Sequence, residues 1–173
     1  ATATIGTTKT AGLIKLSTGE SAQLTVSLTT NMDKKTTEVK NSAGVVENKE
    51  TYYISNYLTS RFFATIKNTN TIVAKNVKAK INLPTETTAV IYDEIVGSYE
   101  DITDGIEVGD IAPGETKNIE FELRAERIEE ENSEEKEIGL EITADNLQTL
   151  ANSNRIAFII NTSKFEEFEN YPN

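Results

Sequence analysis

The chain has 173 residues, with 28 Asp and Glu against 17 Lys and Arg, and its formal net charge is −11. This length predicts a single domain large enough to bury a core without disulfides, and the chain has no Cys with which to form one. The acidic balance argues against nucleic acid, whose phosphates need a basic face, and against charge-driven binding to anionic membranes. No apolar run approaches the roughly 18 residues of a transmembrane helix.

The chain lacks the residues on which most enzyme active sites depend. There is no His, which removes the commonest general base, the Ser-His pair and most zinc sites. There is also no Cys nucleophile, GxSxG motif, phosphate loop or H-E-x-x-H motif. A carboxylate pair could still hydrolyse glycosides, but nothing in the pattern singles out two acids. We therefore expect that the protein is not an enzyme.

The first expected element is residues 1–12, which are rich in Thr and small residues and suit an extended chain. The chain begins with Ala rather than Met, as the mature end left by a signal peptidase would, so we expect an extracellular or cell-surface protein. Adjacent strands are predicted at 11–17 and 21–29, with a turn at Gly19-Glu20 between them. Residues 29–50 are polar and predict a long surface loop or an edge hairpin.

Aromatic residues are concentrated between positions 51 and 67, which hold Tyr52, Tyr53, Tyr57, Phe62 and Phe63. Residues 61–67 predict a strand, and residues 52–58 a strand or a helical turn. Large rings in a strand-rich segment usually pack inward, so the core is the favoured location, with a carbohydrate-binding platform as the alternative.

Further strands are predicted from period-two alternation at 77–83, 119–124 and 138–144, and from short apolar runs at 88–92 and 155–160. Pro84 ends the first of these, and Ala112-Pro113-Gly114-Glu115 fits a type II turn. We expect a loop with one short strand at 93–110, a charged loop at 126–137 and a connector at 147–154. Eight or more short strands without a sustained helical period predict an all-β antiparallel sandwich of jelly-roll or Ig-like type.

An acidic, glycine-spaced segment is the main candidate for a ligand site. Its carboxylates belong to Asp93, Glu94, Glu100, Asp101, Asp104 and Asp110. Hard oxygen ligands on a flexible loop suit Ca²⁺, although the spacing is not that of an EF-hand. A solubilising acidic loop is the other interpretation, and both stay open. Calcium bound between subunits would offset the repulsion between acidic chains. Asn161-Thr162-Ser163 is the single glycosylation sequon, with Asn161 as the acceptor.

Two stretches carry a resemblance to known families. Residues 64–70, 77–84, 111–115 and 119–123 resemble Ig-like modules of bacterial and archaeal surface proteins. Residues 3–16, in which small residues and Thr lead to Thr10-Ala11-Gly12 and then to an apolar strand, look like the mature N-terminus of the TasA/camelysin fibre proteins. The plan is also similar to that of archaeal donor-strand pili and the calcium-associated, tube-forming cannula proteins. The resemblance implies a jelly-roll domain over 13–173, polymerised through a donor strand over 1–12.

The donor-strand hypothesis gives residues 1–12 a physical role. A strand added by a neighbouring copy supplies main-chain hydrogen bonds to an unpaired sheet edge, and its alternate side chains fill pockets. Ile5 would be the apolar anchor, and the remaining predicted interface residues are Thr2, Thr4, Gly6, Thr8, Thr10 and Gly12. The contact is head-to-tail and does not close, so filaments or tubes follow. The alternatives are that residues 1–10 form an edge strand of their own sheet, and that the protein is a monomeric adhesion or carbohydrate-binding module.

Overall fold

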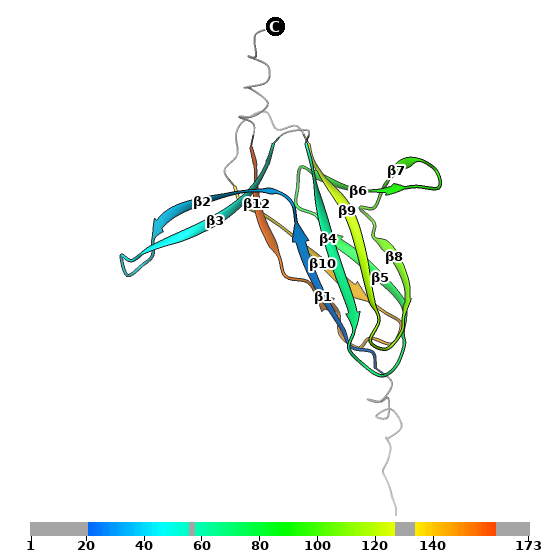
Figure 1. Cartoon of the computed structure of the whole chain (residues 1–173). Helices are drawn as coiled ribbons and strands as arrows, with labels where there is room; N and C mark the ends of the chain where they lie inside the picture. Colours follow the sequence, from blue (N-terminus) through cyan, green and yellow to red (C-terminus); the bar gives the residue numbers. More distant parts are fainter. Residues whose placement is uncertain (1–20, 56–57, 127–133, 162–173) are drawn as a thin grey trace, which may run out of the picture.

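The structure, a computed structural model, describes residues 21–55, 58–126 and 134–161, and within these residues all regular structure is β (Figure 1). The strands are β1 (Leu24–Thr30), β2 (Asp33–Lys40), β3 (Val46–Ser55), β4 (Thr59–Asn68), β5 (Ala74–Asn82), β6 (Thr87–Asp93), β7 (Ser98–Asp101), β8 (Ile106–Ile111), β9 (Thr116–Ala125), β10 (Lys136–Thr143), β11 (Ala151–Asn152) and β12 (Ile156–Asn161). No helix in this part of the chain is long and apolar enough to cross a membrane.

The strands form two sheets that pack face to face. One sheet has the order β1-β4-β9-β6-β7, and the other has the order β2-β3-β12-β10-β5-β8, with β11 also paired to β10. All the strand pairs are antiparallel except β12 with β3, which is parallel. The predicted all-β, Ig-like sandwich is therefore confirmed, with one parallel pair that the expectation of an antiparallel fold did not include.

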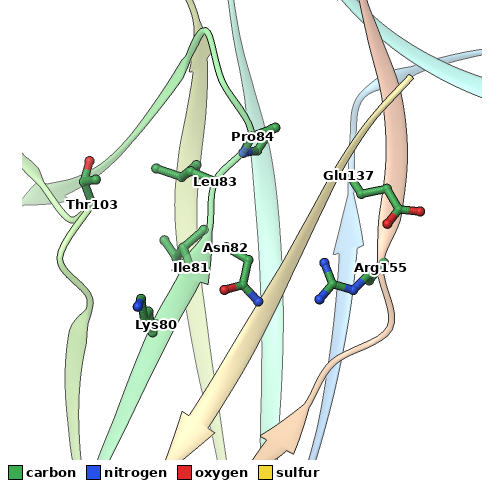
Figure 2. A pocket seen from close by; sticks show the side chains of 8 residues that line it. All are labelled: Lys80, Ile81, Asn82, Leu83, Pro84, Thr103, Glu137 and Arg155. Atoms are coloured by element: carbon green, nitrogen blue, oxygen red, sulfur yellow. The ribbon is translucent and has the colours of Figure 1, made fainter. Parts of the chain in front are cut away.

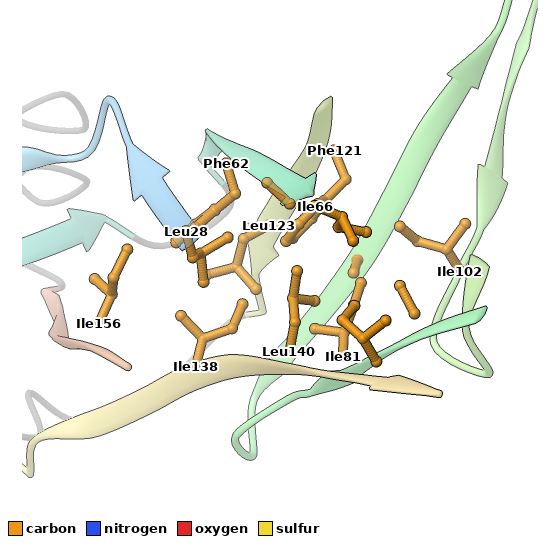
Figure 3. Packing of buried hydrophobic residues seen from close by; sticks show 14 of the residues in the cluster. Leu28, Phe62, Ile66, Ile81, Ile102, Phe121, Leu123, Ile138, Leu140 and Ile156 are labelled. Carbon is orange, nitrogen blue, oxygen red and sulfur yellow. The ribbon is translucent and has the colours of Figure 1, made fainter. Parts of the chain in front are cut away.

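Alternating side chains of the central strands form the core between the sheets, as the period-two pattern predicts (Figure 3). In β4 the buried residues include Phe62 and Ile66, and in β9 they include Phe121 and Leu123. The rings of Phe62 and Phe121 lie opposite each other on neighbouring strands and stack, with 5.5 Å between their centroids. From the other sheet, β10 contributes Ile138, Leu140 and Ile142.

Two hairpins project from opposite sides of the sandwich (Figure 1). The β2–β3 hairpin settles the choice left open for residues 29–50, because they form an edge hairpin and not a loop. The β6–β7 hairpin corrects the expectation for residues 93–110, which contain β7 and β8 and not one short strand. All four residues of β7 are exposed, so it has no inward-facing apolar residues from which the sequence could have predicted a strand.

Candidate functional site

The outer edge of β1 is open over a short stretch. Leu28 donates its N–H to Asn154 Oδ1 at 2.8 Å and accepts from Asn154 Nδ2 at 2.9 Å, on the side away from β4. Main-chain groups of alternate residues in a strand point to the same edge, so those of Leu24 and Val26 also point outward. Within the described residues no hydrogen bond satisfies these four outward groups of Leu24 and Val26. They could accept one added strand.

A side chain and a loop limit this open edge at its two ends. Asn154 occupies it at Leu28, and Ala22 closes the other end by donating its N–H to the carbonyl oxygen of Asn146 at 2.8 Å. An added strand therefore gains main-chain bonds over only a few residues.

A groove with a mixed apolar and polar lining lies beside the open edge. Its volume is about 320 Å³, and it runs between the start of β1 and the segment that leads into β11. Its lining residues are Ser21, Ala22, Gln23, Leu24, Leu147, Gln148, Thr149, Leu150 and Ala151. Leu150 is 48% exposed, so apolar surface is available to an incoming side chain. An open main-chain edge next to a groove that offers apolar side chains such as Leu150 is compatible with strand addition.

The sequence did not identify this edge, although one signal for it is present. Residues 147–154 were predicted to be a connector, and they contain the two-residue strand β11 followed by Ser153 and Asn154. Ser153 Oγ accepts the N–H of Leu140 at 2.8 Å. A side chain therefore replaces a main-chain acceptor for β10 in the gap between β11 and β12. The polar run Asn152-Ser153-Asn154, which precedes the apolar strand β12, is compatible with such a gap. The predicted donor residues Thr2, Thr4, Ile5, Gly6, Thr8, Thr10 and Gly12, and the predicted strand at 11–17, lie outside the described residues.

The six predicted calcium ligands are spread over the β6–β7 hairpin, the loop after it and β8. Asp93 Oδ1 accepts the N–H groups of Ile95 and Val96 at 2.8 and 3.1 Å, and it thereby shapes the hairpin turn. Asp101 Oδ1 accepts from the N–H of Thr103 at 2.7 Å, and Asp110 Oδ1 accepts from that of Asn76 at 2.8 Å. The other three acids, which are exposed, are Glu94, Glu100 and Asp104.

Hydrogen bonds from the main chain also set the acidity of two of these groups. The N–H groups of Val96 and Ile95 hold the pKa of Asp93 below its usual value, because they stabilise the carboxylate form. The Thr103 hydroxyl and N–H lower the pKa of Asp101 in the same way. Across the described residues no three acids gather at one point that could hold a metal ion. Calcium binding stays a prediction. The described residues of a single chain do not bring enough acidic ligands together to coordinate the ion.

The aromatic residues predicted near 51–63 divide between locations. Phe62 is fully buried, whereas its neighbour Phe63 is 37% exposed on the opposite face of β4. Tyr52 and Tyr53 are half-buried in β3, which belongs to the other sheet, and Tyr57 lies outside the described residues. The prediction of a core location is right for Phe62 and wrong for Phe63. The described rings do not share one face, so they do not form a common platform.

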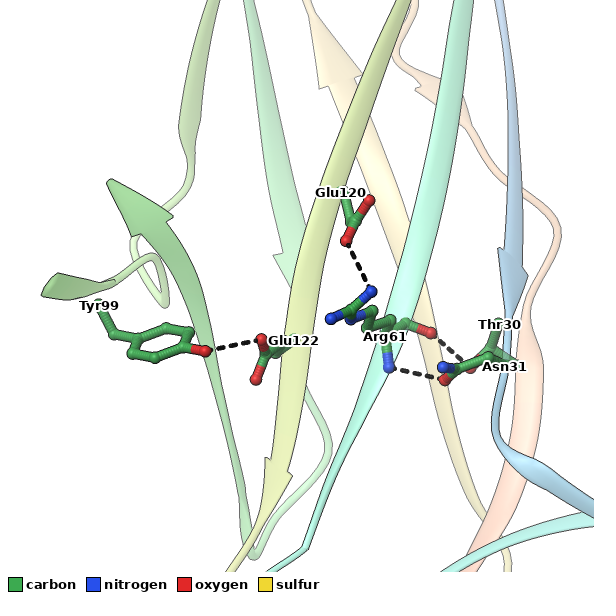
Figure 4. A network of polar contacts seen from close by, with 6 residues as sticks. All are labelled: Thr30, Asn31, Arg61, Tyr99, Glu120 and Glu122. Carbon is green, nitrogen blue, oxygen red and sulfur yellow. Dashed lines mark hydrogen bonds and ion pairs between the residues drawn. The ribbon is translucent and has the colours of Figure 1, made fainter. Parts of the chain in front are cut away.

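A different aromatic pair, which sequence reasoning missed, lies on the outer face of the β1-β4-β9-β6-β7 sheet. Tyr92 and Tyr99 meet edge to face with 5.2 Å between their ring centroids, and each is about half exposed, at 51% and 50%. Tyr99 donates its hydroxyl to Glu122 at 3.1 Å, which raises the pKa of Tyr99 (Figure 4). Arg124 lies 5.9 Å from the Tyr99 ring centroid. Aromatic faces beside charged groups on an exposed sheet can bind a polar ligand.

The same outer face continues across β4. Arg61 lies 3.7 Å from a carboxylate oxygen of Glu120, and its main chain bonds to Thr30 and Asn31 at the end of β1 (Figure 4). Both members of the Arg61–Glu120 pair are more than half exposed, so the pair adds little to stability.

A second cavity, of about 470 Å³, lies on the other sheet (Figure 2). It is lined by Lys80, Ile81, Asn82, Leu83, Pro84, Thr103, Glu137 and Arg155. Glu137 is the one carboxylate in this lining, so the paired carboxylates of glycoside hydrolysis are not formed by this cavity. The predicted glycosylation acceptor, Asn161, is half-buried at the end of β12 opposite Ser55 of β3.

No protein-family model matches the chain, and no curated protein matches it. Solved structures that it is similar to include the CARDB domain of the PF1109 protein from Pyrococcus furiosus, in complex with di-metal ions, at 13% identity and a TM-score of 0.45 over 82% of this chain and 90% of that one. A family 123 glycoside hydrolase from Clostridium perfringens is similar at 11% identity and a TM-score of 0.44, over 81% of this chain and 28% of that one.

Proposed function

We propose that the protein is an extracellular structural subunit that assembles head-to-tail, with residues 1–12 of one copy added as a strand along the open edge of β1 in the next. The observation that carries this proposal is the pair of outward-facing residues Leu24 and Val26, whose main-chain groups lack partners in the described structure, beside a groove of mixed lining.

The size of the open edge suits the sequence of the proposed donor. Ile5 is the one large apolar residue among residues 1–12, and it has Thr4 and Gly6 on either side. Burying one Ile side chain contributes about 1.5–3 kcal/mol, and each main-chain hydrogen bond contributes a net of about 0.5–1.5 kcal/mol. The few residues of the donor around Ile5 therefore match a short edge beside one groove. The affinity per joint is modest, and a filament repeats the joint along its length.

Repulsion between acidic copies opposes this assembly, and bound calcium would reduce that repulsion. Each copy carries a formal charge of −11, and salt screens part of the repulsion between copies. We retain the calcium proposal in this form: exposed acids of the β6–β7 hairpin bind Ca²⁺ together with acids of a neighbouring copy. This arrangement requires ligands from two chains.

The experiment compares two substitutions at Val26 in the full chain. Val26→Pro removes the outward N–H, and Pro is tolerated on an edge strand where the N–H does not serve the ladder. Val26→Ala keeps the N–H and shortens the side chain. We expect filaments by negative-stain microscopy from the parent chain and Val26→Ala, and loss of filaments with Val26→Pro. Circular dichroism confirms that both variants are folded, and parallel samples with Ca²⁺ or EDTA test the cation.

Disulfide trapping distinguishes a donor strand that comes from another copy and a donor strand that comes from the same chain. The parent chain has no Cys, so the only thiols are those introduced. Ile5→Cys and Leu150→Cys are made as separate single variants and mixed under mild oxidation. A covalent heterodimer, enriched over either homodimer, supports exchange between copies. If the double variant forms its disulfide within one chain and the mixed singles do not cross-link, residues 1–10 belong to their own sheet and the proposal is wrong. Filaments that persist with Val26→Pro would also overturn it.

A second candidate function, a monomeric adhesion or carbohydrate-binding module, is favoured by the exposed Tyr92–Tyr99 pair beside Glu122 and Arg124. Sugar rings stack on exposed aromatic faces, and charged neighbours bond their hydroxyls. Under this proposal Tyr99→Ala abolishes binding on a glycan array, whereas Phe63→Ala does not. Absence of glycan binding by the parent chain would count against it.

A further inference from the structure

The β2–β3 hairpin leaves the sandwich as a two-stranded ribbon (Figure 1). Every residue of β2 is exposed, and so are the first five residues of β3. Strand β12 supports β3 only from Tyr52 to Ser55, so the outer part of the ribbon has β2 and β3 alone. A two-stranded ribbon without a packed face is marginal in water, and three or more strands are needed for stability. The outer edge of β2 is therefore a place where another strand would add stability.

The hairpin turn shows which main-chain groups point to that edge. Asn41 donates its N–H to the carbonyl of Val45 at 2.9 Å, and Gly44 donates to the carbonyl of Asn41 at 2.9 Å. Asn41 therefore faces β3, and by alternation so do the odd-numbered residues of β2. The even-numbered residues Lys34, Thr36, Glu38 and Lys40 direct their N–H and C=O groups outward. In the described part of the chain no main-chain bond reaches these groups.

The side chains of β2 complement one another when the strand pairs with a second copy of itself. Antiparallel pairing of outward-facing residues with Thr36 on the two-fold axis places Thr36 opposite Thr36 of the second copy. The same register places Lys34 opposite Glu38 of the second copy, and it does so twice. Opposite charges directly across an antiparallel pair are stabilising.

The neighbouring registers are worse. A shift one way places Lys34 opposite Lys40 of the second copy, and a shift the other way places the two copies of Lys35 opposite each other. Lysines on an edge strand commonly deter pairing. Lys34 already lies 2.9 Å from a carboxylate oxygen of Glu50 in β3, and the Thr36 register places Glu38 of the second copy beside it as a further opposite charge. That register follows from the order of charges in Asp33–Lys40 together with the direction of the outward groups.

We propose that the outer edge of β2 is a homodimer interface, in which two copies pair antiparallel about Thr36 and join their hairpins into one four-stranded ribbon. The contact is self-complementary and closes as a two-fold dimer. It differs from the head-to-tail joint at β1 and does not depend on it. If both contacts form, the dimer links neighbouring filaments side by side. An edge of eight residues buries less than the roughly 1,200 Å² of a stable interface, so the isolated dimer is weak and repeated contacts along a filament strengthen it.

The test uses two single-cysteine variants of the full chain, Thr36→Cys and Thr37→Cys, each in the Val26→Pro background that disables the proposed head-to-tail joint. The opposed Cα atoms at position 36 would lie about 5.5 Å apart, within the disulfide range of about 4.4–6.8 Å. The two Cα atoms at position 37 would be offset by two residues and roughly 8 Å apart, which is too far. We expect a covalent dimer on a non-reducing gel at least tenfold faster for Thr36→Cys than for Thr37→Cys.

A charge reversal tests the register. Glu38→Lys in the Thr36→Cys chain places Lys opposite Lys twice, and we expect dimer formation to slow about fivefold. Adding Lys34→Glu together with Glu50→Lys restores the opposite charges across the interface and keeps the ion pair between positions 34 and 50 within each chain, and the rate should recover. Equal cross-linking of the two cysteine variants, or no dimer with Thr36→Cys, would overturn the dimer. Because head-to-tail assembly is disabled in every chain, failure here leaves the proposed function standing, and failure of that function leaves the dimer standing.

Discussion

Asn68 is a buried amide whose removal gives the sharpest stability test of the fold. It is fully buried at the end of β4, and its side chain makes three hydrogen bonds to main-chain groups. Asn68 Nδ2 donates to the carbonyls of Ile72 and Ile111 at 2.7 and 2.9 Å, and Asn68 Oδ1 accepts the N–H of Asn70 at 2.9 Å. The side chain thus ties the turn after β4 to the end of β8.

Asn68→Ala leaves two carbonyls and one N–H without this partner. Each unsatisfied buried polar group costs about 1–3 kcal/mol. Taking the lower value for each, because turn residues can partly reach water, we expect the free energy of unfolding to fall by about 3 kcal/mol. For a chain of this size that corresponds to a drop in Tm of roughly 6–12 °C.

Urea unfolding followed by circular dichroism measures the loss, and Asn118→Ala provides the control. Asn118 is also on a strand of this sheet, but it is exposed and accepts one hydrogen bond, from the Thr65 hydroxyl. Its removal should change stability by less than about 0.5 kcal/mol. Equal effects of the two substitutions, or a loss below about 1 kcal/mol for Asn68→Ala, would refute the assignment of Asn68 as a buried tie.

Two further predictions concern the β6–β7 hairpin and the core. The pKa of Asp93 is lowered in the folded chain, so its contribution to stability is complete above the unfolded value of about 4 and is lost as the pH falls below it. Asp93→Asn keeps an oxygen acceptor without a titrating group, so its urea midpoint should fall less between pH 6 and pH 3 than that of the parent chain; an equal fall would contradict the assignment. Phe62→Ala should cost about 3–5 kcal/mol, because it removes a fully buried ring stacked on Phe121. Phe63→Ala, at a position that is 37% exposed, should cost less, about 1–2 kcal/mol; similar urea midpoints for the two variants would show that the alternation in β4 is misassigned.

The parts of the fold that could be predicted from sequence are those where burial imposes a period of two. Strands β4, β5, β9 and β10 alternate buried and exposed residues along most of their length, and their existence was predicted. The turn at 112–115 was also predicted: Glu115 donates its N–H to the carbonyl of Ala112, and Gly114 has a φ of 75°. Local chemistry was sufficient in both cases.

The parts that could not be predicted depend on partners distant in the chain. Strands β2 and β7 are wholly exposed, so no apolar pattern distinguishes them from loops. The bonds between Asn154 and Leu28 join positions 126 residues apart, and nothing in the order of residues indicates that these two meet. The open edge of β1 is defined by that contact, which explains why the candidate acceptor site emerged only from the structure.

The placement of β12 has a consequence for biosynthesis. This strand lies between β3 and β10 and pairs with both, so the second sheet is divided until residues 156–161 leave the ribosome. Until then the β2–β3 hairpin and β10 lack β12, the strand that pairs with both β3 and β10. Contacts between residues so distant in sequence form slowly. A chain exported before it folds would avoid this delay in the cytosol, since β12 would already be made when folding begins.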